Sequence, residues 1–295
     1  MSEKFQSGFV SIIGRPNVGK STLLNHFAGE KVAIISNKPQ TTRNQIKTVV
    51  TGENHQIVFI DTPGLHAPKS KLGDYMVKSA KTTFSEVDVV LFLIDATRQK
   101  KDEDILEMLK SVKTPVLLII NKVDAIDKQE ILKLIDSYRD VYSFKEIVPI
   151  SALTGENTEE LSKLIVKHLP EGPKYFPDDT LTDQPERQIV SEIIREKLLL
   201  CMDEEIPHGT AVEVVSMKER AGKDIVDVEA MIYCEKESHK GMIIGKGGQM
   251  LKNIGTKARR DIERLLGSPV NLQIWVKPKK DWRNNDFYLR NFGYK

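Results

Sequence analysis

A glycine-rich run near the N-terminus holds residue types that bind phosphate. The run follows the apolar stretch 9–13 and reads Gly14-Arg15-Pro16-Asn17-Val18-Gly19-Lys20-Ser21. Glycines allow backbone N–H groups to turn toward an anion, and a helix that begins after the loop adds the positive end of its dipole. Lys20 can reach the β- and γ-phosphates of a nucleotide, and the Ser21 hydroxyl can ligate Mg²⁺. Taken alone, the run also fits a glycine turn before a helix, so the rest of the chain decides its meaning.

Two further segments hold groups that complete a magnesium and phosphate site. After the apolar residues 57–60 comes Asp61-Thr62-Pro63-Gly64, where Asp61 can hold Mg²⁺ and the Gly64 N–H can meet a γ-phosphate. Between the first predicted helix and the next predicted strand comes Pro39-Gln40-Thr41-Thr42-Arg43. A threonine hydroxyl in such a loop can complete the Mg²⁺ shell only while the γ-phosphate is present. By itself, the segment that begins at Asp61 also fits an ordinary turn.

Two segments after later predicted strands can recognise guanine. The first, after residues 116–120, is Asn121-Lys122-Val123-Asp124, and the second, after residues 147–150, is Ser151-Ala152-Leu153. The Asp124 carboxylate can accept from N1–H and the 2-amino group of guanine, donors that adenine lacks, so a buried carboxylate there would discriminate strongly. Asn121 can contact the base edge, the Lys122 stem can cover the base face, and the Ser151 segment can supply a backbone N–H to guanine O6. The first segment alone also fits a helix cap.

These five segments occur in order beside predicted strands, and together they favour a nucleotide site over a set of turns. Over about residues 8–170 the chain resembles the translation-factor-related P-loop GTPases. The resemblance implies hydrolysis of GTP to GDP, with GTP or GDP and Mg²⁺ as cofactors. It selects Thr42 over Thr41, so that Ser21, Thr42 and Asp61 hold the metal. It also implies that the catalytic positions are Asn17, Lys20, Thr42 and Gly64.

One residue expected of many such GTPases is missing. A glutamine that orients the attacking water often follows the Asp-x-x-Gly segment, but this chain has Leu65 there. A leucine side chain can neither align water nor accept a proton, so hydrolysis must use another group or a partner. In the resembled group, an asparagine at the place of Asn17 can coordinate K⁺ where an arginine finger would lie. Asn17 as a cap of its own loop is the equally weighted alternative.

A second glycine-rich loop indicates RNA binding. Gly245-Lys246-Gly247-Gly248 matches the GXXG loop of KH domains, which clamps about four single-stranded nucleotides. A helix ending at Ile244 precedes it, and basic residues follow on the next predicted helix. We expect RNA contacts from Ile244, the four loop residues, Lys252, Lys257 and Arg260. A bare helix-turn-helix corner is the weaker alternative.

The C-terminal residues are basic and rich in aromatic side chains. Residues 236–295 carry 14 Lys and Arg against 5 Asp and Glu, whereas residues 176–235 carry 6 against 15. Such a basic block fits a nucleic-acid surface about as well as a solvated mixed-charge one. The aromatic residues after Trp282 can stack unpaired bases, but a short helix that packs them on the preceding domain is favoured slightly.

The pattern of apolar residues predicts the elements that position both sites. Apolar runs at 9–13, 57–60, 87–94, 116–120 and 147–150 alternate with amphipathic segments, as in a parallel sheet covered by helices on both faces. We therefore expect an α/β doubly wound P-loop GTPase domain at 1–170 and a proline-rich linker at 171–185. An α+β type II KH domain with the order helix, strand, strand, helix, helix, strand is expected at 186–280, and a basic-aromatic tail at 281–295.

Composition is that of a soluble globular protein: the chain has 295 residues, of which 40% are hydrophobic and 29% charged. Neither an apolar stretch of about 18 residues nor a signal-peptide pattern is present in the sequence, so a cytoplasmic protein is expected. The two cysteines, Cys201 and Cys234, lack metal-ligand spacing and are expected to be small core residues.

Both halves together resemble the Era-like GTPases across essentially the whole chain. The resemblance implies a monomeric factor of 30S ribosomal subunit assembly that binds the 3′ end of 16S rRNA. It also implies peripheral association with the cytoplasmic face of the cell membrane, which the basic tail permits. Three alternatives stay open: a GTPase of tRNA modification or maturation, an RNA-binding module that holds GTP without turnover, and a membrane-associated signalling GTPase.

Overall fold

The computed structural model describes residues 4–35, 46–61, 87–98, 101–202 and 206–292. The described residues form two compact units. The first contains residues 4–33, 46–61, 87–98 and 101–183, and the second contains residues 34–35, 184–202 and 206–292. Each unit has its own hydrophobic core. No helix in the described ranges is long and apolar enough to cross a membrane.

Six strands form the sheet of the first unit, in the order β2-β3-β1-β4-β5-β6. All neighbours are parallel except β2 and β3, which form an antiparallel pair. The strands are β1 (Gln6–Ile13), β2 (Ile46–Thr51), β3 (His55–Asp61), β4 (Val89–Asp95), β5 (Val116–Asn121) and β6 (Glu146–Ile150). The five apolar runs predicted as strands are confirmed. Strand β2 is additional, because Lys47, Thr48 and Thr51 interrupt its apolar pattern.

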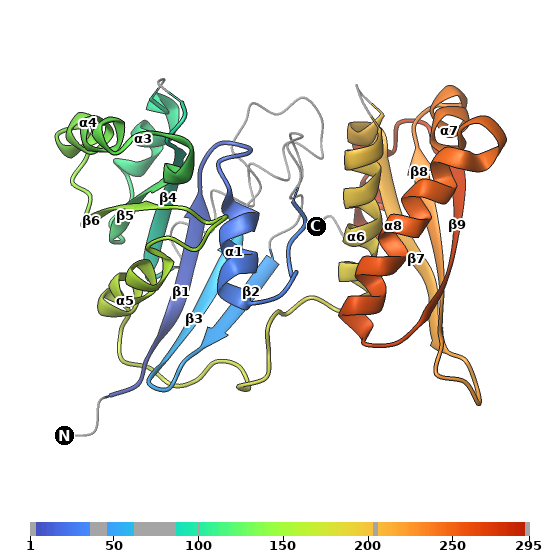
Figure 1. Cartoon of the computed structure of the whole chain (residues 1–295), viewed down its shortest axis with the longest axis horizontal. Coiled ribbons are helices and arrows are strands. Elements are labelled where there is room, and N and C mark those ends of the chain that lie inside the picture. Colours follow the sequence, from blue (N-terminus) through green and yellow to red (C-terminus); the bar gives the residue numbers. More distant parts are fainter. Residues whose placement is uncertain (1–3, 36–45, 62–86, 99–100, 203–205, 293–295) are drawn as a thin grey trace. The chain divides into compact units, whose positions relative to one another are not determined.

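Helices cover both faces of this sheet, as Figure 1 shows. One core cluster joins α1 (Lys20–Ala28) and α5 (Thr158–His168) to the sheet, and a second joins α3 (Glu103–Leu109) and α4 (Lys128–Arg139) to the opposite face. The predicted doubly wound α/β architecture is therefore confirmed. In such sheets ligands bind beyond the carboxyl ends of the strands, where the phosphate and base segments predicted above all begin.

The second unit has the predicted order of elements. It runs α6 (Glu186–Cys201), β7 (Thr210–Glu219), β8 (Val226–Cys234), α7 (Glu237–Ile244), α8 (Gln249–Leu266) and β9 (Val270–Pro278). Strand β8 pairs antiparallel with β7 and parallel with β9. Apolar residues from α6, α8 and one sheet face form a single core, which includes the fully buried Cys234. Cys201 is only partly buried and packs against that core.

The proline-rich segment predicted as a linker packs along the first unit as far as Asp183. The Pro170 and Pro173 carbonyls accept from the backbone N–H and the Oγ of Ser7, at 3.1 and 2.6 Å. Gln56, fully buried on β3, donates to the Phe176 carbonyl and accepts from the N–H groups of Tyr175 and Phe176. A segment too rich in proline for a helix or a sheet is thus held by hydrogen bonds from both its carbonyl and its N–H groups.

Residues after β9 pack onto the second unit as a short helix, α9 (Asp286–Asn291). Trp282 is fully buried and donates from Nε1 to the Gly209 carbonyl at 3.0 Å. Phe292 packs against the rings of Trp282 and Tyr233. Most of these aromatic rings therefore contact protein, although Phe287 is 64% exposed. The packing interpretation of the tail is the one that this geometry favours.

Candidate nucleotide site and nucleic-acid groove

Two glycines of the phosphate loop occupy positions that no larger residue fits. Gly14 has a φ of 151°, and a Cβ atom there would lie 2.3 Å from the Leu93 carbonyl oxygen. Gly19 has a φ of 102°, and its Cβ would lie 2.2 Å from the Nδ2 atom of Asn121. Both values lie in the region that glycine adopts at little cost. The loop between β1 and α1 is therefore shaped by close backbone approach, as a phosphate cradle requires.

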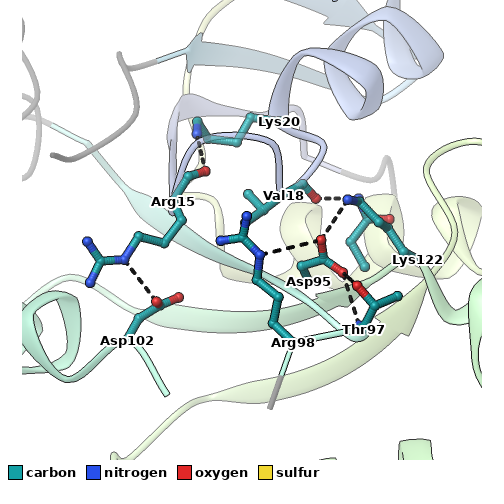
Figure 2. A network of polar contacts seen from close by, with 9 residues as sticks. Arg15, Val18, Lys20, Asp95, Thr97, Arg98, Asp102 and Lys122 are labelled. Atoms are coloured by element: carbon teal, nitrogen blue, oxygen red, sulfur yellow. Dashed lines mark hydrogen bonds and ion pairs between the residues drawn. The ribbon is translucent and has the colours of Figure 1, made fainter. Parts of the chain in front are cut away.

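Lys20 lies at the start of α1 and is directed into this loop. Its side chain is buried, and Nζ donates to the carbonyls of Gly14 and Arg15 at 3.1 and 3.0 Å. Figure 2 shows the ammonium group turned toward the Arg15 carbonyl. Burial lowers the pKa of Lys20 to about 8, and the nearby Asp61 carboxylate opposes that shift. The loop thus holds a cation where a polyphosphate would bind.

Ser21 and Asp61 bring two hard oxygen donors together next to Lys20. Asp61 ends β3 and is fully buried, and Ser21 Oγ lies 3.5 Å from its Oδ2 atom. Hydroxyl and carboxylate oxygens are ligands that Mg²⁺ accepts when phosphate and water complete its shell. The donor set therefore fits a magnesium ion at the loop.

Asn121, the last residue of β5, connects two loops through its side chain. Its side chain is 2% exposed; Nδ2 donates to the Val18 carbonyl at 2.8 Å, and Oδ1 accepts from the Ala152 N–H at 2.9 Å. One amide thus ties the phosphate loop to the Ser151 segment. From the sequence we expected this amide to contact a base edge. Both of its hydrogen bonds run instead to backbone atoms of the protein.

The remaining residues of the two guanine segments differ in burial and in their partners. Lys122 has a φ of 69° and pairs its ammonium with Asp95 at 2.6 Å, and Val123 is buried. Asp124 is exposed in a short 3₁₀ turn after β5, where a ligand can reach it. Of the following loop, Ser151 is fully buried, whereas Leu153 is 77% exposed.

Acidic residues that the sequence analysis did not select hold two of the site residues. Arg15 donates from Nε to Asp102 at 2.9 Å and also pairs with Asp104. Asp95, which pairs with Lys122, is the last residue of β4. Its position at the carboxyl end of a strand, like that of Asp61, was the signal that could have identified it.

Several predicted site residues lie outside the described residues. Among them are Thr42, Thr62, Pro63 and Gly64, and Leu65 lies there too. Asn17 is described and has a φ of 68°, a conformation that asparagine tolerates better than most residues. This geometry fits an asparagine that shapes the loop, and it is compatible with a K⁺ ligand as well.

The second glycine loop joins α7 to α8 with three glycines at positive φ. Gly245, Gly247 and Gly248 have φ values of 73°, 59° and 79°. At Gly245 a Cβ would lie 2.6 Å from the Cβ of Met250, whereas Gly247 and Gly248 have open space around them. Lys246, between Gly245 and Gly247, begins a 3₁₀ turn. The last two glycines therefore leave backbone open to an approaching phosphate.

A groove of about 530 Å³ runs from this loop between α8 and β9. Lys252 and Arg259 bring positive charge to it, and apolar side chains of β9 form part of its wall. The lining residues are Gly248, Leu251, Lys252, Gly255, Thr256, Arg259, Leu272 and Ile274. Charged edges for phosphates beside an apolar wall for bases are what a single-stranded nucleic acid needs.

Lys257 lies on another face of α8. Its Nζ is 3.7 Å from the sulfur of Cys201 on α6, and Asn253 contacts the same sulfur at 3.8 Å. Helical spacing places residues 252, 256 and 259 along one face of α8 and residues 253, 257 and 260 along a neighbouring one. Of the basic side chains expected to bind RNA, Lys252 lines the groove and Lys257 does not. Arg259, not among those expected, does.

Two family models match the chain, one in each unit. Residues 9–122 match the model described as a 50S ribosome-binding GTPase, and residues 205–283 match the KH domain model. The first match includes the phosphate loop, Asp61 and Asn121, and the second includes the glycine loop 245–248 and the groove beside it.

Curated relatives match over nearly the whole length. GTPase Era of Clostridioides difficile is 59% identical over 293 residues, covering 98% of this chain and 99% of the relative. GTPase Era of Alkaliphilus metalliredigens is 58% identical over 292 residues, again covering 98% of this chain and 99% of the relative.

Solved structures of Era proteins are similar to this chain over nearly its whole length. A variant of Era from Aquifex aeolicus bound to GDP and AlF₄⁻ superimposes with a TM-score of 0.93 and 43% identity, covering 98% of this chain and 99% of the other. A structure of Era in complex with MgGDPNP and nucleotides 1506–1542 of 16S ribosomal RNA has a TM-score of 0.94 and 44% identity, with the same coverage.

Proposed function

This chain belongs to the Era family of GTPases, and on that basis we propose that it hydrolyses GTP while its second unit binds the 3′ end of 16S rRNA. The observation that carries the proposal is the presence of two phosphate-binding loops in one chain. The first lies at the carboxyl edge of the sheet beside Lys20 and Asp61, and the second opens into the groove of the KH domain.

At the nucleotide site, the proposed roles of Lys20, Ser21 and Asp61 are supported by their positions, and those of Thr42 and Gly64 by the family to which the chain belongs. Lys20 and the loop N–H groups bind the β- and γ-phosphates, and Gly64 donates its N–H to the γ-phosphate. Ser21, Asp61 and Thr42 hold Mg²⁺, which when bound neutralises charge on the phosphate oxygens. Asp124 accepts from guanine, and Asn121 acts from behind by holding Val18 and Ala152 in place.

Asn17 is the proposed source of the catalytic help that Leu65 cannot give. Its side chain would contribute an oxygen ligand to K⁺, so that the monovalent cation lies against the phosphates as an arginine finger would. What supports this is the place of Asn17 in the loop, with a backbone conformation that asparagine tolerates. The role of Asn17 is open to a direct test by cation exchange.

Coupling between the two loops makes the protein a switch. In this proposal Thr42 and Gly64 would contact Mg²⁺ and the γ-phosphate only in the GTP-bound protein, and those contacts would favour RNA capture by the KH domain. Their loss on hydrolysis would favour release. The proposal requires a different RNA affinity in the GTP-bound and GDP-bound proteins.

We extend the proposal to the cellular setting of the family. The RNA partner would be reached on the 30S subunit during its assembly, by a monomeric cytoplasmic protein. The proposal includes peripheral contact with the cytoplasmic face of the cell membrane, which the excess of basic residues in 236–295 favours.

The central experiment measures GTP turnover in K⁺ buffer with and without a single-stranded RNA that carries the 3′ end of 16S rRNA. We expect turnover that the RNA changes, and tighter RNA binding with a non-hydrolysable GTP analogue than with GDP. Identical affinities would refute the switch, and an absence of turnover with both RNA and K⁺ would favour the module that only holds GTP.

A variant separates the remaining alternatives. Gly247→Asp places a negative charge where the loop leaves open space, so it should abolish RNA binding and leave the first unit intact. Retained cellular function in this variant, together with tight liposome binding, would favour a membrane signalling role instead.

A further inference from the structure

A buried carboxylate lies beside the base-recognition segment. Asp95 ends β4, its side chain is 4% exposed, and it pairs in register with Asn121 on the neighbouring parallel strand. The Ala96 N–H donates to the Asn121 carbonyl at 2.8 Å. The carboxylate is therefore fixed at the same sheet edge as the residues that face the nucleotide.

The two oxygens of Asp95 have separate partners. Oδ1 accepts from the backbone N–H of Thr97 at 3.0 Å and from its hydroxyl at 2.6 Å. Oδ2 accepts from the Lys122 ammonium at 2.6 Å, with the guanidinium of Arg98 at 3.9 Å. Figure 2 shows Lys122 and Arg98 directed to this carboxylate from two sides, with Thr97 next to it. The turn at Thr97 orients the carboxylate and leaves the other oxygen for a cation.

Lys122 is held at both ends. Its backbone follows the anchored Asn121, and its ammonium is bound to the nearly buried Asp95, yet 37% of its side chain is exposed. Because a lysine side chain free in solution populates many rotamers, fixing its tip restricts the arrangements open to the aliphatic stem.

We propose that Asp95 is a positioning residue for guanine-nucleotide binding: by holding the Lys122 ammonium, it places the Lys122 stem as a surface against which the base packs. This rests on the proposed function, since the ligand is the nucleotide of the first unit. Asp95 acts through Lys122 and does not itself contact the base. The remaining charge, Arg98, is half exposed and more distant, so it contributes little to this arrangement.

The test is a double-mutant cycle on the full chain, read by displacement of a fluorescent GDP analogue. Asp95→Asn keeps an oxygen for Thr97 but loses the acceptor for Lys122, and Lys122→Met keeps an apolar stem without its charge. We expect each single variant to raise the Kd for GDP about tenfold. The double variant should match Lys122→Met within about twofold, because the second change removes a contact already lost.

Two readouts separate positioning from a general structural effect. The preference for GDP over inosine diphosphate should be unchanged in Asp95→Asn, since a stem that covers the ring face does not read the 2-amino group. Thr97→Val, which removes only the hydroxyl bond to Oδ1, should lower the melting temperature but keep the Kd within about twofold of wild type.

Effects of the two single changes that multiply in the double variant would overturn the inference, as would a rise in Kd for Thr97→Val equal to that for Asp95→Asn. If the unchanged protein does not bind GDP, the proposed function fails. If it binds GDP and Asp95→Asn binds it equally well, only the inference about Asp95 fails.

Discussion

The amide of Asn121 offers the sharpest test of how the nucleotide site is built. Replacing Asn121 with alanine removes the donor to the Val18 carbonyl and the acceptor for the Ala152 N–H. Val18 is 1% exposed and Ala152 3%, so water cannot readily replace the lost partners. Two backbone groups in separate loops are left unsatisfied by one substitution.

The size of the effect follows from those two groups. A buried polar group without a partner costs about 1–3 kcal/mol, so with two such groups the free energy of unfolding of the first unit should fall by about 2–6 kcal/mol. Domains are stable by about 5–15 kcal/mol, so the unit should stay folded at low temperature. Since the two released loops belong to the nucleotide site, GDP should bind at least about tenfold more weakly.

The assay uses the distribution of tryptophan in the chain. The two tryptophans, Trp275 and Trp282, both belong to the second unit, so their fluorescence in a urea titration reports that unit. Far-ultraviolet circular dichroism reports both units. For Asn121→Ala we expect an earlier transition by circular dichroism, an unshifted one by fluorescence, and faster release of a fluorescent GDP analogue.

A matched variant separates stability from nucleotide binding. Gln56 is another buried amide that binds backbone groups, but it lies near the amino end of β3, away from the phosphate loop. Gln56→Ala should destabilise the first unit by a similar amount and leave GDP release unchanged. The reasoning is refuted if Asn121→Ala loses less than about 0.5 kcal/mol, or if Gln56→Ala speeds GDP release equally.

Three further predictions concern pH, RNA and the monovalent cation. Because burial lowers the pKa of Lys20 to about 8, Lys20 is charged in the ligand-free protein below pH 8. Above pH 8, GDP binding should weaken and be accompanied by uptake of a proton. Calorimetry in buffers of different ionisation enthalpy would detect that proton. The same shift makes the ligand-free protein more stable as pH rises from about 8 toward 10.5, since the unfolded lysine binds more protons there. Arg259→Glu should weaken RNA binding about tenfold and reduce the salt dependence of that binding. Lys257→Glu makes the same change of charge on another face of α8 and should weaken binding less than about threefold. Equal losses in the two variants would contradict RNA binding in the groove. Exchange of Na⁺ for K⁺ should raise GTP turnover, and Asn17→Gly, which keeps the positive φ available, should remove that gain; equal rates in both cations would reject the role of Asn17.

Local sequence was enough to predict the architecture and the two glycine-rich loops. The apolar runs gave five of the six strands of the first sheet, because parallel strands covered on both faces must be apolar along their whole length. The two loops could be recognised from their glycines, because the backbone conformations at Gly19 and Gly247 are ones that other residues adopt only with strain. Strand β2 was missed because it is a short edge strand with a mixed pattern.

Contacts between segments distant in the chain could not be predicted. Whether Asn121 binds a base or two loops depends on Val18 and Ala152, which lie 103 and 31 residues away along the chain. Lys257 and Arg259 look alike in sequence, and only the packing of α8 between α6 and β9 decides which of them lines the groove.

Sequence by itself therefore determined that a phosphate loop, a guanine segment and a KH loop exist in this chain, because each depends on residue types at short, fixed spacing. Tertiary structure alone decided how these segments are held: Asn121 between two loops, and Lys122 against Asp95. The physical reason is that spacing along one strand or helix sets the local backbone. The partner of a side chain depends on how separate segments pack: the register of β4 against β5, for example, brings Asp95 beside Asn121 and Lys122, and no single segment encodes it.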